Sequence, residues 1–273
     1  MTSERIPAVL SIAGSDSGGG AGIQADLKAF ARVGVHGMTA ITAITAQNTV
    51  GVDAVELVSP EMVLDQIATV GGDIRIDAIK IGMLGSAETV ESVFLGLLLA
   101  YVNAPVVIDP VMVAESGAIL LEDDTRTALV ERLFSKAAVV TPNIPEARAL
   151  TGMGEAATQE DLARGVLKLG PKAVVVTGGH STEIVDVFYD GEQMVEIPGE
   201  RHPDGAAHGS GCTHSSSLAA YLALGWSPLA AAVGARELTS EAVRDGLREI
   251  GAGAGPVDVF GLARSRSDAE VTR

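Results

Sequence analysis

The residues with the clearest chemical potential lie at 208–214, which read His-Gly-Ser-Gly-Cys-Thr-His. An Ala/Leu/Ser-rich stretch follows and is predicted to be helical. Unpaired amide groups at a helix N-terminus, together with the helix dipole, favour a bound anion such as phosphate. Cys212 falls in the first turn, where the pKa of a thiol tends to decrease, so it could accept the proton of an attacking hydroxyl group. The alternative, that Cys212 is only a small buried hydrophobic side chain, fits the sequence equally well. A zinc site of Cys212 with His214 is not expected, because no second pair of ligands accompanies them.

A second glycine-rich segment, Gly14–Gly22, lies between a short apolar run and a predicted helix. It lacks the terminal Gly-Lys-Ser/Thr of a phosphate-binding P-loop. It also has Ile23 where the dinucleotide-binding fingerprint needs glycine or alanine. Two interpretations remain. Its glycines let a ligand approach the backbone closely, or the segment is simply a tight connection between a strand and a helix.

Two acidic residues follow predicted strands and are candidates for a magnesium site. In the segment 141–146, Thr-Pro-Asn-Ile-Pro-Glu, Asn143 can cap a helix, with Glu146 in the reciprocal capping position. Glu146 could instead lie beside a magnesium ion, through water, because magnesium keeps several waters and takes few carboxylates. Asp109 would be the second acidic group at the same sheet edge, or would only stabilise its turn.

Short apolar runs alternate with segments of helical periodicity, which predicts an α/β fold with a mostly parallel sheet covered by helices on both faces. Ligands bind such sheets at the carboxyl ends of the strands, where the segments above fall. The predicted strands are Ala8–Ala13, Thr39–Thr45, Ala78–Ile81, Pro105–Ile108, Ala137–Thr141 and Ala173–Thr177. An antiparallel hairpin with an Asp-Gly turn is predicted from Ile184–Tyr189 and Met194–Pro198. The predicted helices are Ile23–Val33, Glu61–Val70, Ala87–Val102, Asp124–Phe134, Glu146–Thr151, Gln159–Leu169 and a helical region from Thr213 to about Ile250, broken at Gly225–Pro228.

The composition limits the classes of function. The chain has 273 residues, 47% of them hydrophobic, and no linker or repeat divides it, so we expect one domain over 1–273 with a frayed polar tail at 264–273. A formal net charge of −16 argues against nucleic-acid and anionic-membrane partners, which need a basic face. The N-terminus does not resemble a signal peptide, and the longest apolar run, Val93–Val102, is shorter than the roughly 20 residues of a membrane span. With one cysteine no internal disulfide can form, and we expect a cytoplasmic protein.

Taken together, the segments resemble the hydroxymethylpyrimidine/phosphomethylpyrimidine kinases of thiamine biosynthesis, within the ribokinase-like superfamily. The resemblance extends from Ala8 to about Phe260 and rests on motifs in the family's order. These are Ala-Gly-Ser-Asp-Ser-Gly-Gly-Gly-Ala-Gly-Ile-Gln-Ala-Asp-Leu-Lys at 13–28, Ala-Gln-Asn-Thr at 46–49, Lys-Ile-Gly-Met-Leu-Gly at 80–85, Asp-Pro-Val-Met at 109–112, Thr-Pro-Asn-Ile-Pro-Glu-Ala at 141–147, Gly-Gly-His at 178–180 and His-Gly-Ser-Gly-Cys-Thr at 208–213.

The resemblance implies a three-layer α/β/α fold with an antiparallel edge hairpin, ATP and Mg²⁺ as cofactors, and a homodimer. It implies phosphorylation of 4-amino-5-hydroxymethyl-2-methylpyrimidine to its monophosphate and then its diphosphate. Cys212 would be the catalytic base, replacing the aspartate of ribokinase-like sugar kinases, and Gln47 would recognise the pyrimidine. The other implied residues are Gly209, Ser210 and Gly211 for the anion hole, Gly14, Asp26, Met83 and Val111 for the substrate pocket, Asn143, Thr177, Gly178 and Gly179 for ATP, and Asp109 and Glu146 for the metal.

The sequence departs from the family pattern at three places. Thr177 replaces a lysine of many relatives and so removes a cation near the nucleotide. Ala206-Ala207 replace an Asn-Thr pair, and Gly251–Val257 lacks a lysine.

Three alternatives stay open. A pyridoxal kinase of the same fold is the nearest, although relatives that act on pyridoxal tend to carry a Met-Asp-Pro type sequence where this chain has Ala46–Gly51. A catalytically silent pyrimidine-binding protein is possible because a fold does not prove an activity. A sugar kinase fits less well, since a cysteine stands where its aspartate base is expected.

Overall fold

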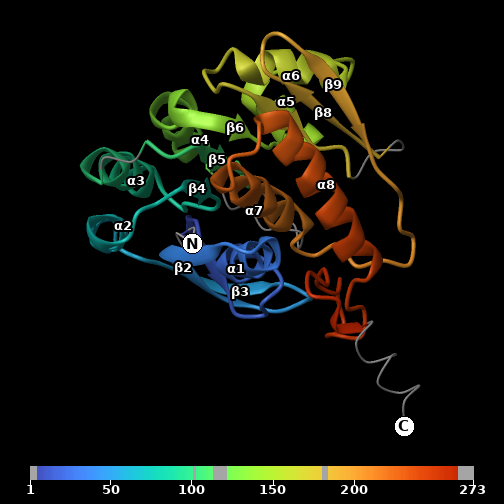
Figure 1. Ribbon diagram of the computed structural model, residues 1–273, viewed down its shortest axis with the longest axis horizontal. Helices are drawn as coiled ribbons and strands as arrows, with labels where there is room; N and C mark the ends of the chain where they lie inside the picture. Colours follow the sequence, from blue (N-terminus) through green and yellow to red (C-terminus); the bar gives the residue numbers. More distant parts are fainter. Residues whose placement is uncertain (1–4, 101–102, 113–121, 180–183, 264–273) are drawn as a thin grey trace.

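The computed structural model describes residues 5–100, 103–112, 122–179 and 184–263. Within them a nine-stranded sheet has the order β3-β2-β1-β4-β5-β6-β7-β8-β9 (Figure 1). The pairs from β2 to β7 are parallel, whereas β3 pairs antiparallel with β2, and β8 and β9 continue antiparallel from β7. The strands are β1 (Ala8–Asp16), β2 (His36–Gln47), β3 (Val52–Leu57), β4 (Ala78–Ile81), β5 (Val106–Ile108), β6 (Ala137–Val140), β7 (Val174–Val176), β8 (Val185–Tyr189) and β9 (Met194–Pro198).

Helices cover both faces of the sheet, because the central strands are apolar on both sides. One face packs against α1 (Gly22–Val33), α7 (Ser210–Ala223) and α8 (Pro228–Arg244). In Figure 1, α7 lies between α1 and α8 in front of the sheet. The other face packs against α2 (Pro60–Asp73), α3 (Ala87–Leu99), α4 (Asp123–Arg132), α5 (Ile144–Thr151) and α6 (Gln159–Leu167), with a 3₁₀ turn at Phe134–Lys136.

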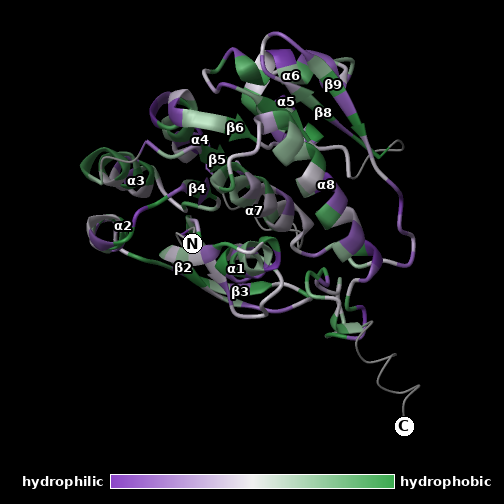
Figure 2. Ribbon diagram, viewed as in Figure 1, coloured by the Kyte–Doolittle hydropathy of each residue, from purple (hydrophilic) through white to green (hydrophobic). Residues whose placement is uncertain are grey.

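The helices begin where the sequence supplies capping groups. Ser59, Ser86 and Ser227 each accept a hydrogen bond from a backbone N–H in the first turn of α2, α3 and α8. Figure 2 shows hydrophilic and hydrophobic residues mixed along α2, α3 and α8, as expected for helices with one face on a core. None of the described helices is long and apolar enough to cross a membrane.

The predicted three-layer α/β/α class and the edge hairpin at 184–198 are confirmed. Strand β3 was not predicted, because its side chains are mostly exposed and include Asp53 and Glu56, so it has no buried apolar run. The prediction of helix to about Ile250 is wrong: α8 ends at Arg244, and Gly246 then packs against Ala206 so closely that no Cβ would fit. The predicted end of α3 at Val102 and the tail at 264–273 lie outside the described residues.

Substitution of Leu10 by alanine should destabilise the protein by about 2–5 kcal/mol, because this fully buried side chain of β1 would leave a cavity in the core. Urea denaturation measures the loss. The matched control is Leu99→Ala, which truncates a leucine that is 61% exposed and should change the free energy of unfolding little. Equal effects of the two substitutions would contradict this assignment of the core.

Candidate active site

A cavity of about 470 Å³ opens at the carboxyl ends of the parallel strands. It extends from the end of β2, across β1, β4, β5, β6 and β7, to β8 and the first turns of α7. Most of the residues predicted for a site meet here. Those that line the cavity are Gly14, Gln47, Met83, Asp109, Val111, Asn143, Glu146, Thr177, Gly179, Gly209, Ser210, Gly211 and Cys212.

The two glycine-rich segments interlock at the wall of the cavity. A Cβ on Gly209, whose φ is +80°, would lie 1.8 Å from the carbonyl oxygen of Gly20, and a Cβ on Gly20 would collide with the His208 ring. Asp16 anchors the contact: its carboxylate accepts hydrogen bonds from the N–H groups of Gly18, Gly20 and Ala21, and His208 Nε2 lies 3.3 Å from Oδ2. Burial opposes ionisation of Asp16, but the bonds from His208 and these amides outweigh it and lower the pKa of the carboxyl. The glycines are therefore needed for the contact between the two loops.

Gly14, Gln47 and Met83 line the end of the cavity beside β1, β2 and β4. Ser17 Oγ donates to the Gln47 carbonyl and accepts from the Gln47 N–H, both at 2.8 Å, so the glycine loop fixes the end of β2. A Cβ on Gly14 would lie 3.4 Å from Met83 Sδ, which places the thioether directly over this glycine. Gln47, Met83 and Val111 line the same cavity, and Gln47 Oε1 accepts a hydrogen bond from Thr45 Oγ1 at 3.2 Å.

A buried ion pair lies one layer beneath the cavity. Lys80 Nζ is 2.9 Å from Asp26 Oδ1, and neither side chain is exposed. Ser11 and Ser216 donate their hydroxyl groups to the same carboxylate. Burial opposes the charge of Lys80, but Asp26, Cys212 and Asp109 together raise the pKa of its ammonium group. Asp26, which was predicted for the substrate pocket, does not line the cavity, whereas Lys80 does line it.

Cys212 is half-buried in the first turn of α7, and the Gly22 N–H is hydrogen-bonded to it. The expectation of a lowered thiol pKa is wrong. Burial, reinforced by the carboxylates of Asp26 and Asp109, raises the pKa of Cys212 to about 12, although Lys80 and the Gly22 N–H oppose the shift. Burial is thus the dominant influence on this thiol and favours its protonated form.

Asp109 and Glu146 form a pair of buried carboxyl groups in the middle of the cavity wall. Burial raises the pKa of Glu146 to about 7, with a contribution from Asp109, while bonds from the Asn143 and Met112 N–H groups oppose the shift. Burial also raises the pKa of Asp109, against the effect of Lys80 and of a 2.9 Å hydrogen bond from Ser215 Oγ. Among the described residues no group of three or more His, Cys, Asp or Glu is placed to hold a metal. Two carboxylates suit a magnesium ion whose other ligands are waters and phosphate oxygens.

Glu146 also has the predicted capping role. Its Oε2 accepts from the Asn143 N–H at 2.9 Å, and Asn143 Oδ1 accepts from the Glu146 N–H at 2.9 Å, which completes the capping box of α5. The capping and metal interpretations are compatible, because each carboxylate oxygen has a second lone pair.

Thr177 and Gly179 line the cavity beyond β7, and a bridge pairs Thr177 with Asn143. Gly178 does not line it. Its N–H donates to Asp186 Oδ1 at 2.9 Å, and a Cβ there would lie 2.0 Å from the Val185 carbonyl, so this glycine is required for close packing on β8. Of the predicted residues, only Asp26 and Gly178 thus fall outside the cavity lining.

Several cavity residues were not predicted, notably Lys80, Asp186, His208, His214 and Arg236. His208 belongs to the motif that contains Cys212, and Lys80 to the motif that contains Gly82, so the sequence could have indicated both as site residues. No sequence signal indicated Asp186 or Arg236, because they come from β8 and α8, which meet only in the folded chain.

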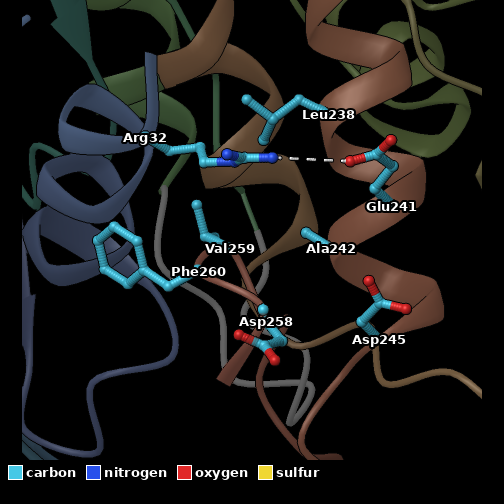
Figure 3. A pocket seen from close by; sticks show the side chains of 9 residues that line it. Arg32, Leu238, Glu241, Ala242, Asp245, Asp258, Val259 and Phe260 are labelled. Carbon is cyan, nitrogen blue, oxygen red and sulfur yellow. Dashed lines mark ion pairs between the residues drawn. The ribbon is translucent and has the colours of Figure 1, made fainter. Parts of the chain in front are cut away.

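A second hollow, of about 220 Å³, lies between α1, α8 and residues 258–261 (Figure 3). Arg32 and Glu241 face each other across it at 3.9 Å, each about half exposed. None of the predicted site residues lines this hollow.

Comparison with known proteins decides the family. The sequence pattern of the phosphomethylpyrimidine kinase family matches residues 16–258. The chain belongs to this kinase family. It is 47% identical over 257 residues to a hydroxymethylpyrimidine/phosphomethylpyrimidine kinase of Rhizobium meliloti, covering 92% of this chain and 96% of the relative. The family and enzyme class predicted from the ordered motifs are confirmed.

Solved structures with the same fold include two kinds of vitamin kinase. An ADP complex of Bacillus subtilis pyridoxal kinase superposes with a TM-score of 0.86 at 36% identity, covering 95% of this chain and 99% of the other. A phosphomethylpyrimidine kinase from Clostridium difficile 630 superposes with a TM-score of 0.76 at 39% identity, covering 88% and 100%. The fold is thus common to kinases named for a pyridine and for a pyrimidine substrate.

Substitution of Gly209 by alanine should separate the two interlocked loops, because the added Cβ meets the Gly20 carbonyl and the positive φ is unfavourable for alanine. We expect a loss of roughly 1–3 kcal/mol in unfolding free energy, measured by chemical denaturation. The matched control is Gly211→Ala, since a Cβ there meets no atom within 4 Å. As alanine favours helix over glycine by about 1 kcal/mol, this variant should be at least as stable as the wild type. A stable Gly209→Ala protein would refute the tight contact.

Glu146 gives a prediction for the dependence of stability on pH. With its pKa raised to about 7 from the usual 4.5, the folded protein binds the Glu146 proton more tightly than the unfolded chain does. The contribution of Glu146 to the free energy of unfolding is therefore fully present below pH 4.5 and is lost as the pH rises through about 7. Glu146→Gln cannot ionise but keeps a capping oxygen. Without magnesium it should exceed the wild type in stability at pH 8 by on the order of 2 kcal/mol, and by little at pH 5.

Thermal unfolding across this pH range measures the effect, with Glu61→Gln in the exposed first turn of α2 as control. A difference between Glu146→Gln and the wild type that stays constant with pH would be inconsistent with a raised pKa.

Proposed function

We propose that this protein transfers the γ-phosphoryl group of ATP to 4-amino-5-hydroxymethyl-2-methylpyrimidine and then to the resulting monophosphate, in thiamine biosynthesis. In the first step the hydroxymethyl oxygen forms a bond to phosphorus, the bond to the ADP oxygen breaks, and the hydroxyl proton leaves. The observation that carries the proposal is that one cavity joins the Gln47 amide, at the end of β2, to the Cys212 thiol, at the start of α7. A ring held at the first group would point its substituent at the second.

The pyrimidine end is assigned to Gln47, Met83, Gly14 and Val111. An amide both donates and accepts, so Gln47 can pair with a ring nitrogen and the adjacent exocyclic amine. Met83 offers an adaptable apolar surface for the ring, and Gly14 leaves room for it. Asp26 would act indirectly, by positioning the Lys80 ammonium group that borders the cavity.

The phosphate end is assigned to the amides of Gly209, Ser210, Gly211 and Cys212. They lie in the first turn of α7, where backbone N–H groups and the helix dipole favour the negative charge of a transferring phosphoryl group. Asn143, Thr177 and Gly179 would follow the nucleotide, with Gly178 supporting that segment from behind. Asp109 and Glu146 would hold magnesium, which neutralises charge on the phosphates when it is bound.

Cys212 is the proposed proton acceptor in the first step. Its raised pKa depends in part on the charge of Asp109, so a cation beside that carboxylate would remove one cause of the shift. The second step begins with a phosphate oxygen as nucleophile and does not need a strong base. Loss of the thiol should thus affect the two steps unequally.

A pyridoxal kinase is the second candidate, favoured by the similarity to the ADP complex of the Bacillus subtilis pyridoxal kinase. A silent pyrimidine-binding protein is the third, and Thr177 is its main support, because it provides no cation for the nucleotide.

We further propose a single domain over 1–273 and a cytoplasmic enzyme, consistent with one cysteine. A homodimer would bury the exposed apolar side chains of Ile44, Val55 and Leu57 on β2 and β3.

Replacement of Cys212 by alanine should lower the rate of monophosphate formation by about 100-fold or more, as expected for loss of a general base. Diphosphate formation from the monophosphate should decrease much less. The measurement is ATP consumption with magnesium, with products identified by mass, on the hydroxymethylpyrimidine, its phosphate, pyridoxal and ribose. An equal decrease in both steps would exclude Cys212 as a base for the first step. Turnover of pyridoxal alone would favour the second candidate, and binding without turnover the third.

A further inference from the structure

Four polar side chains at the β8 end of the cavity are more than nine-tenths buried and have unmet hydrogen-bonding capacity. They are Asp186 of β8, His214 of α7, and Arg236 and Thr239 of α8, and all four line the cavity. Within the part of the chain that the structure describes, Asp186 Oδ2, both ring nitrogens of His214, Arg236 Nε and Thr239 Oγ1 have no hydrogen-bond partner. Buried polar atoms without partners are costly and uncommon, so this group points to a ligand or ordered water in the cavity.

Asp186, His214 and Arg236 form a cluster, and Thr239 lies three residues after Arg236 on α8. Arg236 Nη1 lies 3.5 Å from Asp186 Oδ1, and His214 Nε2 lies 3.6 Å from Asp186 Oδ2. Arg236 Nη2 also donates to the Ile184 carbonyl at 3.3 Å. A Cβ on Gly199 would lie 1.8 Å from Arg236 Nη2, so the absence of a side chain at this position makes room for the guanidinium. These contacts hold the cluster in place without providing a hydrogen-bond partner for Asp186 Oδ2, Arg236 Nε or the His214 ring nitrogens.

The position of the cluster indicates which part of a ligand it meets. Asp186 Oδ1 accepts the hydrogen bond of the Gly178 N–H, so the cluster adjoins the segment assigned to the nucleotide. Strand order places Gln47 on β2 at one end of the cavity and Asp186 on β8 at the other, with Asp109 after β5 between them. Three strand spacings separate β5 from β8, or about 14 Å, which matches the reach from a transferring phosphoryl group to the nucleoside of ATP.

The chemistry of the cluster favours a nucleoside over a phosphate. The charges of Asp186 and Arg236 balance, and the free Asp186 oxygen would repel a phosphate group. Burial, with Arg236 nearby, lowers the pKa of His214 against the influence of Asp186, so the neutral ring has one donor and one acceptor nitrogen. Hydroxyl and amino groups, which both donate and accept, suit this mixture.

We propose that Asp186, His214, Arg236 and Thr239 bind the nucleoside moiety of the phosphoryl donor, through its ribose hydroxyl groups or base edge. The inference rests on the proposed function, since it assumes that a nucleoside triphosphate occupies this end of the cavity. On this proposal, side chains of α7 and α8 contribute nucleotide affinity that a lysine at position 177 would otherwise supply.

Calorimetric titration tests the proposal with two probes, ADP and inorganic tripolyphosphate, in the presence of magnesium. Thr239→Val and His214→Leu remove the hydrogen-bonding groups with little change in volume. Each should weaken ADP binding about threefold to tenfold, the effect of one hydrogen bond, and leave tripolyphosphate binding unchanged. Thr239→Ser, which keeps the hydroxyl group, should restore ADP affinity. The matched control is Arg32→Met, which removes the half-exposed Arg32–Glu241 pair on another face of α8 (Figure 3).

Unchanged ADP affinity in both variants would overturn the inference, and would mean that ordered water satisfies the cluster. An equal loss of ADP and tripolyphosphate affinity would also overturn it, by assigning the cluster to phosphate. If the wild-type protein binds the hydroxymethylpyrimidine but no ADP, both this inference and the use of ATP fail. If the wild-type protein binds ADP and the variants bind it equally well, only this inference fails and the use of ATP stands. Thermal unfolding of each variant identifies any loss that comes from misfolding.

Discussion

A buried ion pair between the Lys80 ammonium and the Asp26 carboxylate connects four elements beneath the cavity. Lys80 comes from β4 and Asp26 from α1, while Ser11 of β1 and Ser216 of α7 donate to the same carboxylate. Such a pair requires complete hydrogen bonding, because loss of one partner of a buried pair costs about 3–5 kcal/mol. Here the bonds are complete only when α1 and α7 lie side by side on β1 and β4. The first turns of these helices, which carry the Gly22 amide and the Cys212 thiol, are positioned by that requirement.

The contact between the two glycine-rich loops is the second constraint on the site. Because Gly20 and Gly209 touch backbone to backbone, the first turn of α7 cannot move independently of the loop that fixes Gln47 through Ser17. Asp16 stabilises the first loop with three amide hydrogen bonds and approaches His208 in the second. The group assigned to the pyrimidine and the amides assigned to the phosphoryl group are thereby held at a fixed separation, which is what positional catalysis of phosphoryl transfer requires.

The sequence was sufficient for features that depend on local pattern. Buried strands such as Ala78–Ile81, the capping box of Asn143 and the gathering of strand ends at one cavity all follow from short-range rules. The sequence was insufficient where contacts between residues far apart in the chain determine the structure. The exposed strand β3 has no apolar run, and Asp26 is identified as a structural partner only when Lys80 is seen beside it. The pKa of Cys212 was predicted with the wrong sign because burial in the folded chain raises it, with contributions from Asp26 and Asp109, which are far away in sequence.

The charges in the cavity also explain how an acidic protein can accept an anionic ligand. With a net charge of −16, the chain repels a free nucleotide at long range. Inside the cavity, burial raises the pKa values of Asp109 and Glu146, which disfavours negative charge on both carboxyl groups. A cation that entered with the phosphates would stabilise both carboxylates in their ionised form. The same cation would weaken the influence of Asp109 on Cys212. With Cys212 as the proposed proton acceptor, the arrival of the phosphoryl donor with its cation would thus make the thiol more ready to accept a proton.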